Sequence, residues 1–270
     1  MRNIIKLEFS NCINSNRFKI MFSILFGISI AGFLITALHY YGSFSYSVNV
    51  TSLMGMLQGS RARTILFFFI SAMPFIVGFM YSDSYYIERK NGINVSLYMR
   101  SGRKKYLLSK LIVIATVSFA SVFFVLFINE LLTFITYNNK GSDIEGMTVY
   151  QYRNRYIAEY FLSNLSINKP LLFTFILIFI NSLYAAIMAM FSYSLTLIIK
   201  IKGIAVITLV SIGNYLLNII IANIGLERTF SMPMYQTGAA GNITSFSILI
   251  IIWLIIIGII FSIGTRKDFI

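Results

Sequence analysis

The sequence has 270 residues, of which 57% are hydrophobic and only 11% charged, and its mean hydropathy is +0.79. Soluble domains are about 45–50% apolar and about 25% charged, so this composition excludes an ordinary soluble domain. The net charge is +13, but the basic residues stand between long uncharged runs, which favours contact with a membrane surface and predicts no nucleic-acid partner. A single cysteine, Cys12, excludes an intramolecular disulfide framework.

Residues 2–19 precede the first long apolar run and predict an amphipathic helix that lies on the membrane surface. Ile5, Phe9 and Ile13 share one face at helical spacing, and Arg17 belongs to the opposite, polar face. A plain basic leader that only orients the first span is the alternative. The segment lacks the short apolar core and small-residue cleavage site of a signal peptide, so we expect the first apolar run to remain as an anchor.

Six long apolar runs follow in chain order. Each is close to the roughly 20 residues that a helix needs to cross about 30 Å of hydrocarbon, and none alternates as a barrel strand does. The predicted spans are residues 20–38, 64–82, 111–129, 171–199, 203–226 and 245–264. We therefore predict an all-α integral membrane protein with six transmembrane helices, forming a single domain over residues 1–270.

The basic residues between the spans predict the orientation of the chain. Segments on the N-terminal side of the membrane carry four, seven, two and two Lys and Arg residues, whereas those on the other side carry two, four and one. By the positive-inside rule, we expect both termini in the cytoplasm. High usage of Ile, Asn and Lys is typical of an AT-rich genome and favours a bacterial plasma membrane as the location.

The loop of residues 83–110 holds the most informative pattern in the chain. It carries seven basic residues, and Gly92 and Gly102 bracket a segment, Ile93–Ser101, that predicts a helix of about two to three turns. Such a helix, standing under the membrane between two spans, would be a compact surface for a cytoplasmic partner. A solvated loop that only orients the spans would have a similar composition.

This loop resembles the one between the second and third spans of ABC-2-type permeases, the membrane subunits of ABC exporters. In that family a Glu follows the second span, a Gly comes a few residues later, and a short coupling helix leads into an Arg…Tyr…Lys run. The matching positions here are Glu88, Gly92, the Ile93–Ser101 segment, Arg103, Tyr106 and Lys110. The N-terminal helix, the six spans and the short basic tail are also similar, but Ser101-Gly102 stands where the family often has a Pro.

The resemblance implies a permease driven by a separate ABC ATPase subunit. No P-loop pattern GxxxxGK[ST] occurs in the sequence, so ATP and magnesium are expected to bind the partner, and this chain needs no cofactor of its own. Two permease chains, identical or related, would enclose the pathway among membrane lipids. The residues implied to couple to the ATPase are Glu88, Arg89, Gly92, Ile93, Leu97, Tyr98, Arg100 and Arg103.

Polar residues within the spans either line a pathway or join helices by hydrogen bonds. The candidates are Asn181, Asn214, Asn218 and Glu130. Asn214 and Asn218 are spaced i, i+4 and therefore share a face of one helix. The small number of fixed charges within the spans favours export of an amphipathic or hydrophobic substrate, either an antimicrobial peptide or a lipid.

Two other classes of function stay open at this point. A non-transporting membrane module, such as a sensor or the substrate-binding subunit of an importer, would have similar spans without needing a coupling helix. An intramembrane enzyme would need clustered nucleophile, His or metal ligands, whereas the sequence has one histidine, His39, and neither HExxH nor GxSxG. We predict no catalytic residues and no metal site.

Overall fold

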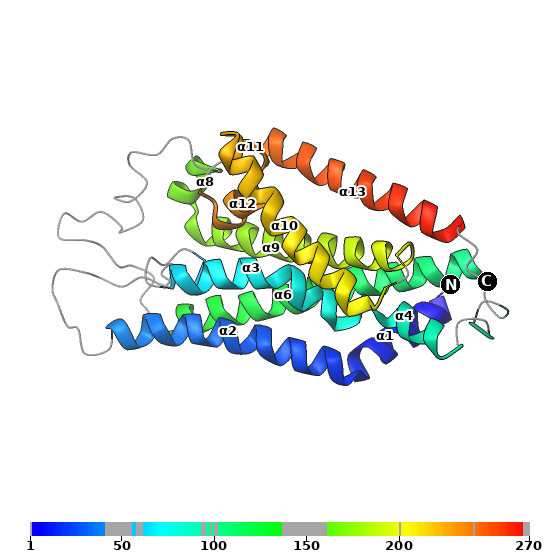
Figure 1. Cartoon of the computed structure of the whole chain (residues 1–270). Helices are drawn as coiled ribbons and strands as arrows, with labels where there is room; N and C mark the ends of the chain where they lie inside the picture. The colour runs from blue at the N-terminus through cyan, green and yellow to red at the C-terminus, as the bar shows by residue number, and fades with distance from the viewer. Residues whose placement is uncertain are drawn as a thin grey trace, which may run out of the picture.

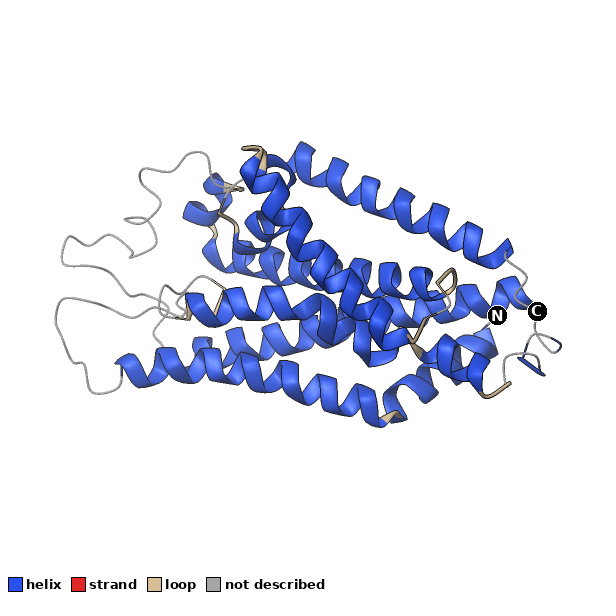
Figure 2. Ribbon diagram, in the orientation of Figure 1, coloured by secondary structure: helices blue, strands red, loops and turns tan. Residues whose placement is uncertain are grey.

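The computed structural model describes residues 2–40, 56–57, 62–92, 96–97, 99, 102–136, 161–199, 201–239 and 241–266. Within these ranges the chain consists of helices and their connections, without a strand (Figure 2). Six helices are long and apolar enough to cross a membrane. The predicted all-α class and the six spans are thus confirmed, and the chain is a multi-pass membrane protein.

Figure 1 shows the arrangement of the helices. In chain order they are α1 (Arg2–Asn14), α2 (Asn16–Tyr40), α3 (Arg63–Tyr81), α4 (Ser84–Lys90), α6 (Arg103–Thr136), α8 (Ser163–Asn168), α9 (Pro170–Thr196), α10 (Gly203–Asn223), α11 (Glu227–Phe230), α12 (Met232–Thr237) and α13 (Ile243–Arg266). The six predicted spans correspond to α2, α3, α6, α9, α10 and α13. Helix α1 and the end of α13 lie at the same end of the bundle, as an even number of spans requires (Figure 1).

Two helices extend further than hydropathy predicted. Helix α6 begins at Arg103 rather than at residue 111, and its 34 residues are about 51 Å long at 1.5 Å per residue, well beyond the thickness of the hydrocarbon core. Helix α2 begins at Asn16, directly after a bend at Ser15, so the predicted N-terminal helix of residues 2–19 is divided between α1 and α2. Hydropathy marks only the part of a helix that lies in lipid, so polar extensions escape it.

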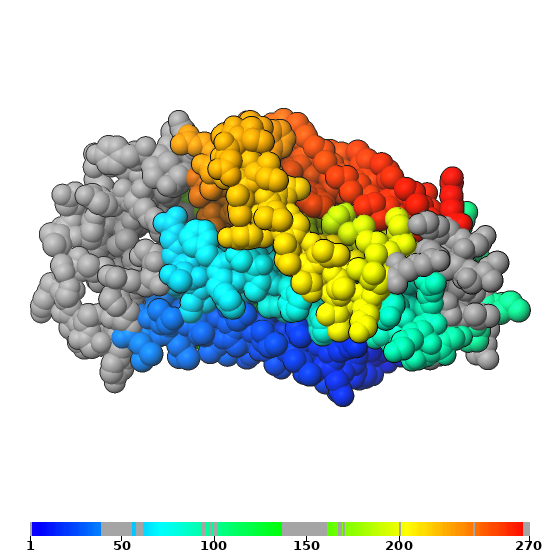
Figure 3. Space-filling model, viewed as in Figure 1, coloured from blue at the N-terminus to red at the C-terminus, as the bar shows by residue number. Residues whose placement is uncertain are grey.

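Helix α9 is the centre of the bundle and packs against α3, α6, α10 and α13. Two-thirds of its most apolar stretch is buried, compared with 17% for α10 and 11% for α13. Small residues at Ser182, Ala185, Ala186 and Ala189 are all buried and allow neighbouring helices to approach closely. Helices α10 and α13 consequently lie along one side of the molecule and present exposed apolar surface (Figure 3).

Two short helices, α11 and α12, lie between α10 and α13 at the end opposite α1 (Figure 1). Met232, Tyr235 and Gln236 of α12 are buried. The Tyr235 ring packs against Phe161 and Phe246, with ring centroids 5.5 and 5.2 Å apart. Sequence analysis did not predict these helices, because elements of four and six residues leave no measurable periodicity.

Candidate functional site

A buried network of charged side chains joins three helices at the end of the bundle that contains α1. The Lys110 ammonium of α6 lies 2.5 Å from Glu88 Oε1 of α4 and 3.5 Å from Glu8 Oε2 of α1. The side chains of Lys110 and Glu8 are 0% and 1% exposed. Charges at this depth are costly unless they are paired, so this contact is a strong constraint on how the three helices pack.

Two tyrosines complete the network. Tyr81 of α3 donates a hydrogen bond to Glu8 Oε2 at 2.8 Å, and Tyr106 of α6 donates one to Glu88 Oε2. Lys110 in turn donates to the Tyr106 hydroxyl at 2.9 Å. We call Glu8, Tyr81, Glu88, Tyr106 and Lys110 the Lys110 network. It sets two carboxylates against one ammonium, and no group in the described part of the chain donates to Glu8 Oε1.

Local sequence explains how these side chains meet. Tyr106 and Lys110 are four residues apart on α6, so they project from one face of that helix. A turn at residues 82–83 separates α3 from α4, so that α4 places Glu88 at the end of the bundle, next to Lys110. Gly92 follows α4 with a φ of 70°, the left-handed conformation with which many helices end and which glycine adopts without strain.

A second ion pair lies beside the network and ties α2 to the turn between α3 and α4. Arg17 of α2 pairs with Asp83, whose side chain is 5% exposed, and its guanidinium also lies over the ring of Phe79, 5.6 Å from the centroid. Gly203, the first residue of α10, packs against the same turn: a Cβ at Gly203 would come within 2.5 Å of the Asp83 Cβ. Four of the six spans therefore meet near residue 83 and Lys110.

The predicted coupling residues fall into two groups. Glu88 belongs to the Lys110 network, Arg89 is on α4, and Arg103 donates to the Gly264 carbonyl at the end of α13 at 3.4 Å. Leu97 is partly buried and packs against the core. Ile93, Tyr98 and Arg100 lie outside the described residues.

The predicted helix between Gly92 and Gly102 can be followed only in part. Ser96, Leu97 and Met99 are helical, and the remaining positions of Ile93–Ser101 are outside the described residues. Both bracketing glycines have positive φ, 70° and 77°, which agrees with their predicted role as chain-turning positions. The Met99 side chain is 87% exposed. Large apolar side chains along the spans are exposed to lipid, but Met99 belongs to a connection between spans, where such exposure is unusual.

Helix α1 turns a different face to the protein than the apolar pattern suggested. Glu8 and Cys12 are buried and Ile5 is half-buried, whereas Phe9 and Ile13 are exposed. Arg17 belongs to α2 rather than to this helix. Glu8, Tyr81 and Asp83 were missed by sequence reasoning. One signal was available, since Glu8 is the only acidic residue before Asp83 and shares a helical face with Cys12.

The four pathway candidates do not form one cluster. Two hydrogen bonds join Asn181 of α9 to Gln236 of α12: Asn181 Nδ2 donates to the backbone carbonyl of Gln236 at 3.0 Å, and Gln236 Nε2 donates to Asn181 Oδ1 at 3.1 Å. Asn181 therefore acts in packing α12 onto α9. Glu130 lies near the far end of α6, and its Oε1 is buried without a hydrogen bond from any described residue.

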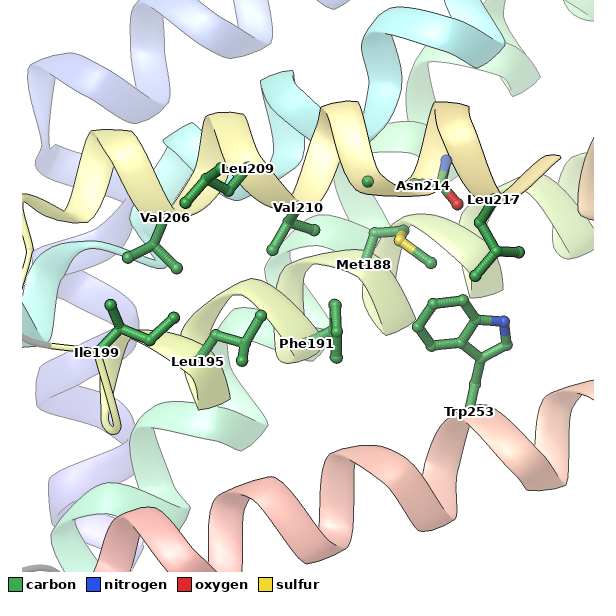
Figure 4. A pocket seen from close by; sticks show the side chains of 11 residues that line it. Met188, Phe191, Leu195, Ile199, Val206, Leu209, Val210, Asn214, Leu217 and Trp253 are labelled. Carbon is green, nitrogen blue, oxygen red and sulfur yellow. The ribbon is translucent and has the colours of Figure 1, made fainter. Parts of the chain in front are cut away.

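Asn214 and Asn218 do share a face of α10, and both line a groove between α9, α10 and α13. The groove consists of two cavities of about 320 and about 380 Å³ that have Asn214, Leu217 and Trp253 in common. Figure 4 shows Trp253 reaching from α13 towards α10, with Met188 and Phe191 of α9 beside it. We call this the α10–α13 groove. Apart from its two asparagines and the tips of Trp253 and Tyr184, its lining is apolar.

Among the described residues, no three His, Cys, Asp or Glu side chains come close enough to hold a metal ion. The chemistry of the two sites thus consists of ion pairs at one end of the bundle and an apolar groove within the span region. Comparisons of the sequence with protein families and with characterised proteins, and of the structure with solved structures, find no match.

Proposed function

We propose that this chain is the membrane subunit of an ABC exporter of the ABC-2 type, which moves an amphipathic or hydrophobic substrate across a bacterial plasma membrane. The observation that carries the proposal is the Lys110 network. It joins α1, α4 and α6 through buried charges immediately before the loop that leaves α4 at Gly92. Since buried ion pairs resist separation, a force on that loop would move the three helices together.

In this proposal both termini and the loop of residues 83–110 are cytoplasmic, and α1 lies in the membrane interface with Phe9 and Ile13 towards the lipid. The segment between Gly92 and Gly102 is the coupling helix, and the ATPase docks on it. The exposed Met99 side chain supplies an apolar contact for that partner. Glu88 supports this docking site indirectly, because its ion pair with Lys110 holds α4 against α6.

Two permease chains, identical or related, would complete the transporter with two ATPases. The support is the exposed apolar surface of α2, α10 and α13. Only 22%, 17% and 11% of the most apolar stretches of these three helices are buried within one chain. A second copy and lipid would share this surface.

Affinity purification of the tagged chain in mild detergent, followed by mass spectrometry, tests the proposal. We expect a stoichiometric ATPase with Walker motifs to copurify. Met99→Asp should abolish this association, because a carboxylate would have to be desolvated in the interface, whereas Met99→Leu should retain it. Both variants should unfold at the wild-type temperature, since Met99 is exposed.

A chain that purifies without an ATPase in every detergent would overturn the exporter proposal. It would favour the non-transporting membrane module instead. If an ATPase binds the wild type and Met99→Asp equally, the exporter proposal stands, but the ATPase does not dock on the segment around Met99.

A further inference from the structure

Two hydrogen-bond donors in the α10–α13 groove have no acceptor in the described part of the chain. Asn214 Oδ1 accepts a hydrogen bond from the Tyr184 hydroxyl at 2.5 Å, which directs the amide nitrogen of Asn214 away from this partner. Neither that nitrogen nor the indole N–H of Trp253 has an acceptor among the residues that the structure describes. In hydrocarbon, water cannot replace the missing acceptor, so each unpaired donor costs free energy until a ligand supplies one.

The depth of Asn214 restricts the ligand. It stands 11 residues after Gly203 in a helix that ends at Asn223, about 16 Å from the start of α10 and thus near the membrane centre. A resident phospholipid places its ester groups at the interface and only methylene groups at this depth, since the hydrocarbon core is about 30 Å thick. Resident lipid would therefore fill the groove without satisfying the donors.

The lining restricts the ligand further. No charged side chain lines either cavity, which excludes an ionised group at this position. A peptide would bring backbone N–H groups of its own, and the groove offers donors rather than free acceptors for them. A long apolar chain with one neutral acceptor fits both the donors and cavities of about 320 and about 380 Å³.

We propose that the α10–α13 groove binds one neutral acyl-chain lipid and holds its ester or amide carbonyl at the membrane centre, where Asn214 and Trp253 donate to the carbonyl oxygen. This names the substrate class of the exporter and in that respect rests on the proposed function. The binding itself needs no ATPase and is tested without one.

Trp253 is the only tryptophan in the chain, so its fluorescence reports on this groove alone. The full-length chain in lipid vesicles is titrated with methyl 3,4-dibromostearate, whose bromines lie beside the carbonyl and quench tryptophan on contact, and in parallel with 3,4-dibromooctadecane, which lacks the carbonyl. We expect the ester to quench in a saturable manner at about one molecule per chain. The alkane should quench only in proportion to its concentration in the bilayer.

Two variants assign the effect to the groove. Gly213 lines the cavity and a Cβ there would meet open space, so Gly213→Leu should fill the groove without a backbone clash and abolish saturable quenching. Gly27→Leu is the matched control, because Gly27 of α2 has equally open surroundings away from the groove. Asn214→Leu should weaken ester binding about tenfold, the equivalent of one lost hydrogen bond, and leave the alkane unchanged.

Equal quenching by the ester and the alkane in the wild type would overturn the proposal, as would an unchanged response in Gly213→Leu. If a hydrophobic peptide displaces the ester at a concentration lower than that of the ester itself, the proposal is overturned and the ligand of the groove is a peptide. Saturable ester binding in a chain that associates with no ATPase would support the lipid site and contradict the exporter proposal. Failure of the lipid site is therefore distinguishable from failure of the proposed function.

Discussion

Lys110 is the residue on which the packing at the α1 end of the bundle depends most directly. Its ammonium is the only cation within the Lys110 network and forms ion pairs with both Glu8 and Glu88. Lys110→Met would keep much of the apolar stem but leave the two carboxylates without a cation, with only the hydrogen bonds from Tyr81 and Tyr106. Removing one partner of a buried ion pair typically costs about 3–5 kcal/mol, so we expect the unfolding temperature in detergent to fall by roughly 10 °C.

Lys105→Met is the matched control for this substitution. Lys105 belongs to the same helix, five residues earlier, but its side chain is exposed. The same chemical change there should leave the unfolding temperature within about 2 °C of wild type, because exposed charges contribute little. If the two variants unfold alike, the Lys110 network does not stabilise the fold.

Cys12 provides a native probe of the docking of α1. Burial, and secondarily the charge of Glu8, raises the pKa of the Cys12 thiol to about 12, and its side chain is fully buried. At pH 8 about one thiol in ten thousand would be ionised, against about a quarter for a free cysteine of pKa 8.5. We expect N-ethylmaleimide to leave the folded wild type essentially unmodified over an hour.

Lys110→Met should release α1 and accelerate the modification of Cys12 at least tenfold, whereas Lys105→Met should not. Since Cys12 is the only cysteine, mass spectrometry of the intact chain reads the reaction directly. Rapid modification of the wild type would mean that α1 does not stay docked on α6.

At the scale of the helices, the position of the start of α10 depends on the close approach of Gly203 to Asp83. Gly203→Ala would place a Cβ 2.5 Å from the Asp83 Cβ and 3.3 Å from its Cα, and one of these atoms belongs to the backbone. The helix would have to shift away from the turn that holds the Arg17–Asp83 pair. We expect a loss of about 1–3 kcal/mol in the free energy of unfolding, typical of overpacking.

Gly213→Ala, on the same helix, tests whether this loss comes from the contact or from the chemical change. Its Cβ would meet nothing within 4 Å, so it should be neutral or stabilise the helix by up to about 1 kcal/mol through higher helix propensity. Denaturant unfolding in mixed micelles measures both variants. A loss of equal size in the two would contradict the role of the close approach.

The helices themselves could be predicted from the sequence, whereas their contacts could not. Apolar runs of about 20 residues can cross lipid only as helices, so five of the six spans were found within about four residues of their bounds, whereas α6 extends eight residues before and seven residues beyond the predicted span. The network was missed because Glu8 and Lys110 are about a hundred positions apart and no periodicity relates them. Glu88 and Tyr106 were singled out only through a resemblance, and the groove around Asn214 required the packing of three helices.

At the scale of the whole molecule, the two sites lie on different parts of the bundle. The Lys110 network joins α1, α4 and α6 at one end, while the α10–α13 groove lies along the side, on the two spans that are least buried within the chain. Helix α9 packs against both α6 and α13 and connects the two regions. In the proposed exporter, movement imposed on the first region would reach the second through this central helix.

The orientation of the chain decides whether the network can meet an ATPase, because ATP is cytoplasmic. In a Cys12→Ala background, we expect a membrane-impermeant maleimide to label Asn223→Cys on intact cells and to label Lys105→Cys only after permeabilisation. Both positions are exposed, Asn223 ends α10 on the side opposite α1, and Lys105 stands near the Lys110 network. The physical reason is the excess of Lys and Arg in the segments on the side of α1, which the positive-inside rule predicts to be cytoplasmic. Labelling of Lys105→Cys but not Asn223→Cys on intact cells would invert the topology, place the network outside the cell and exclude an ATP-driven partner at that end.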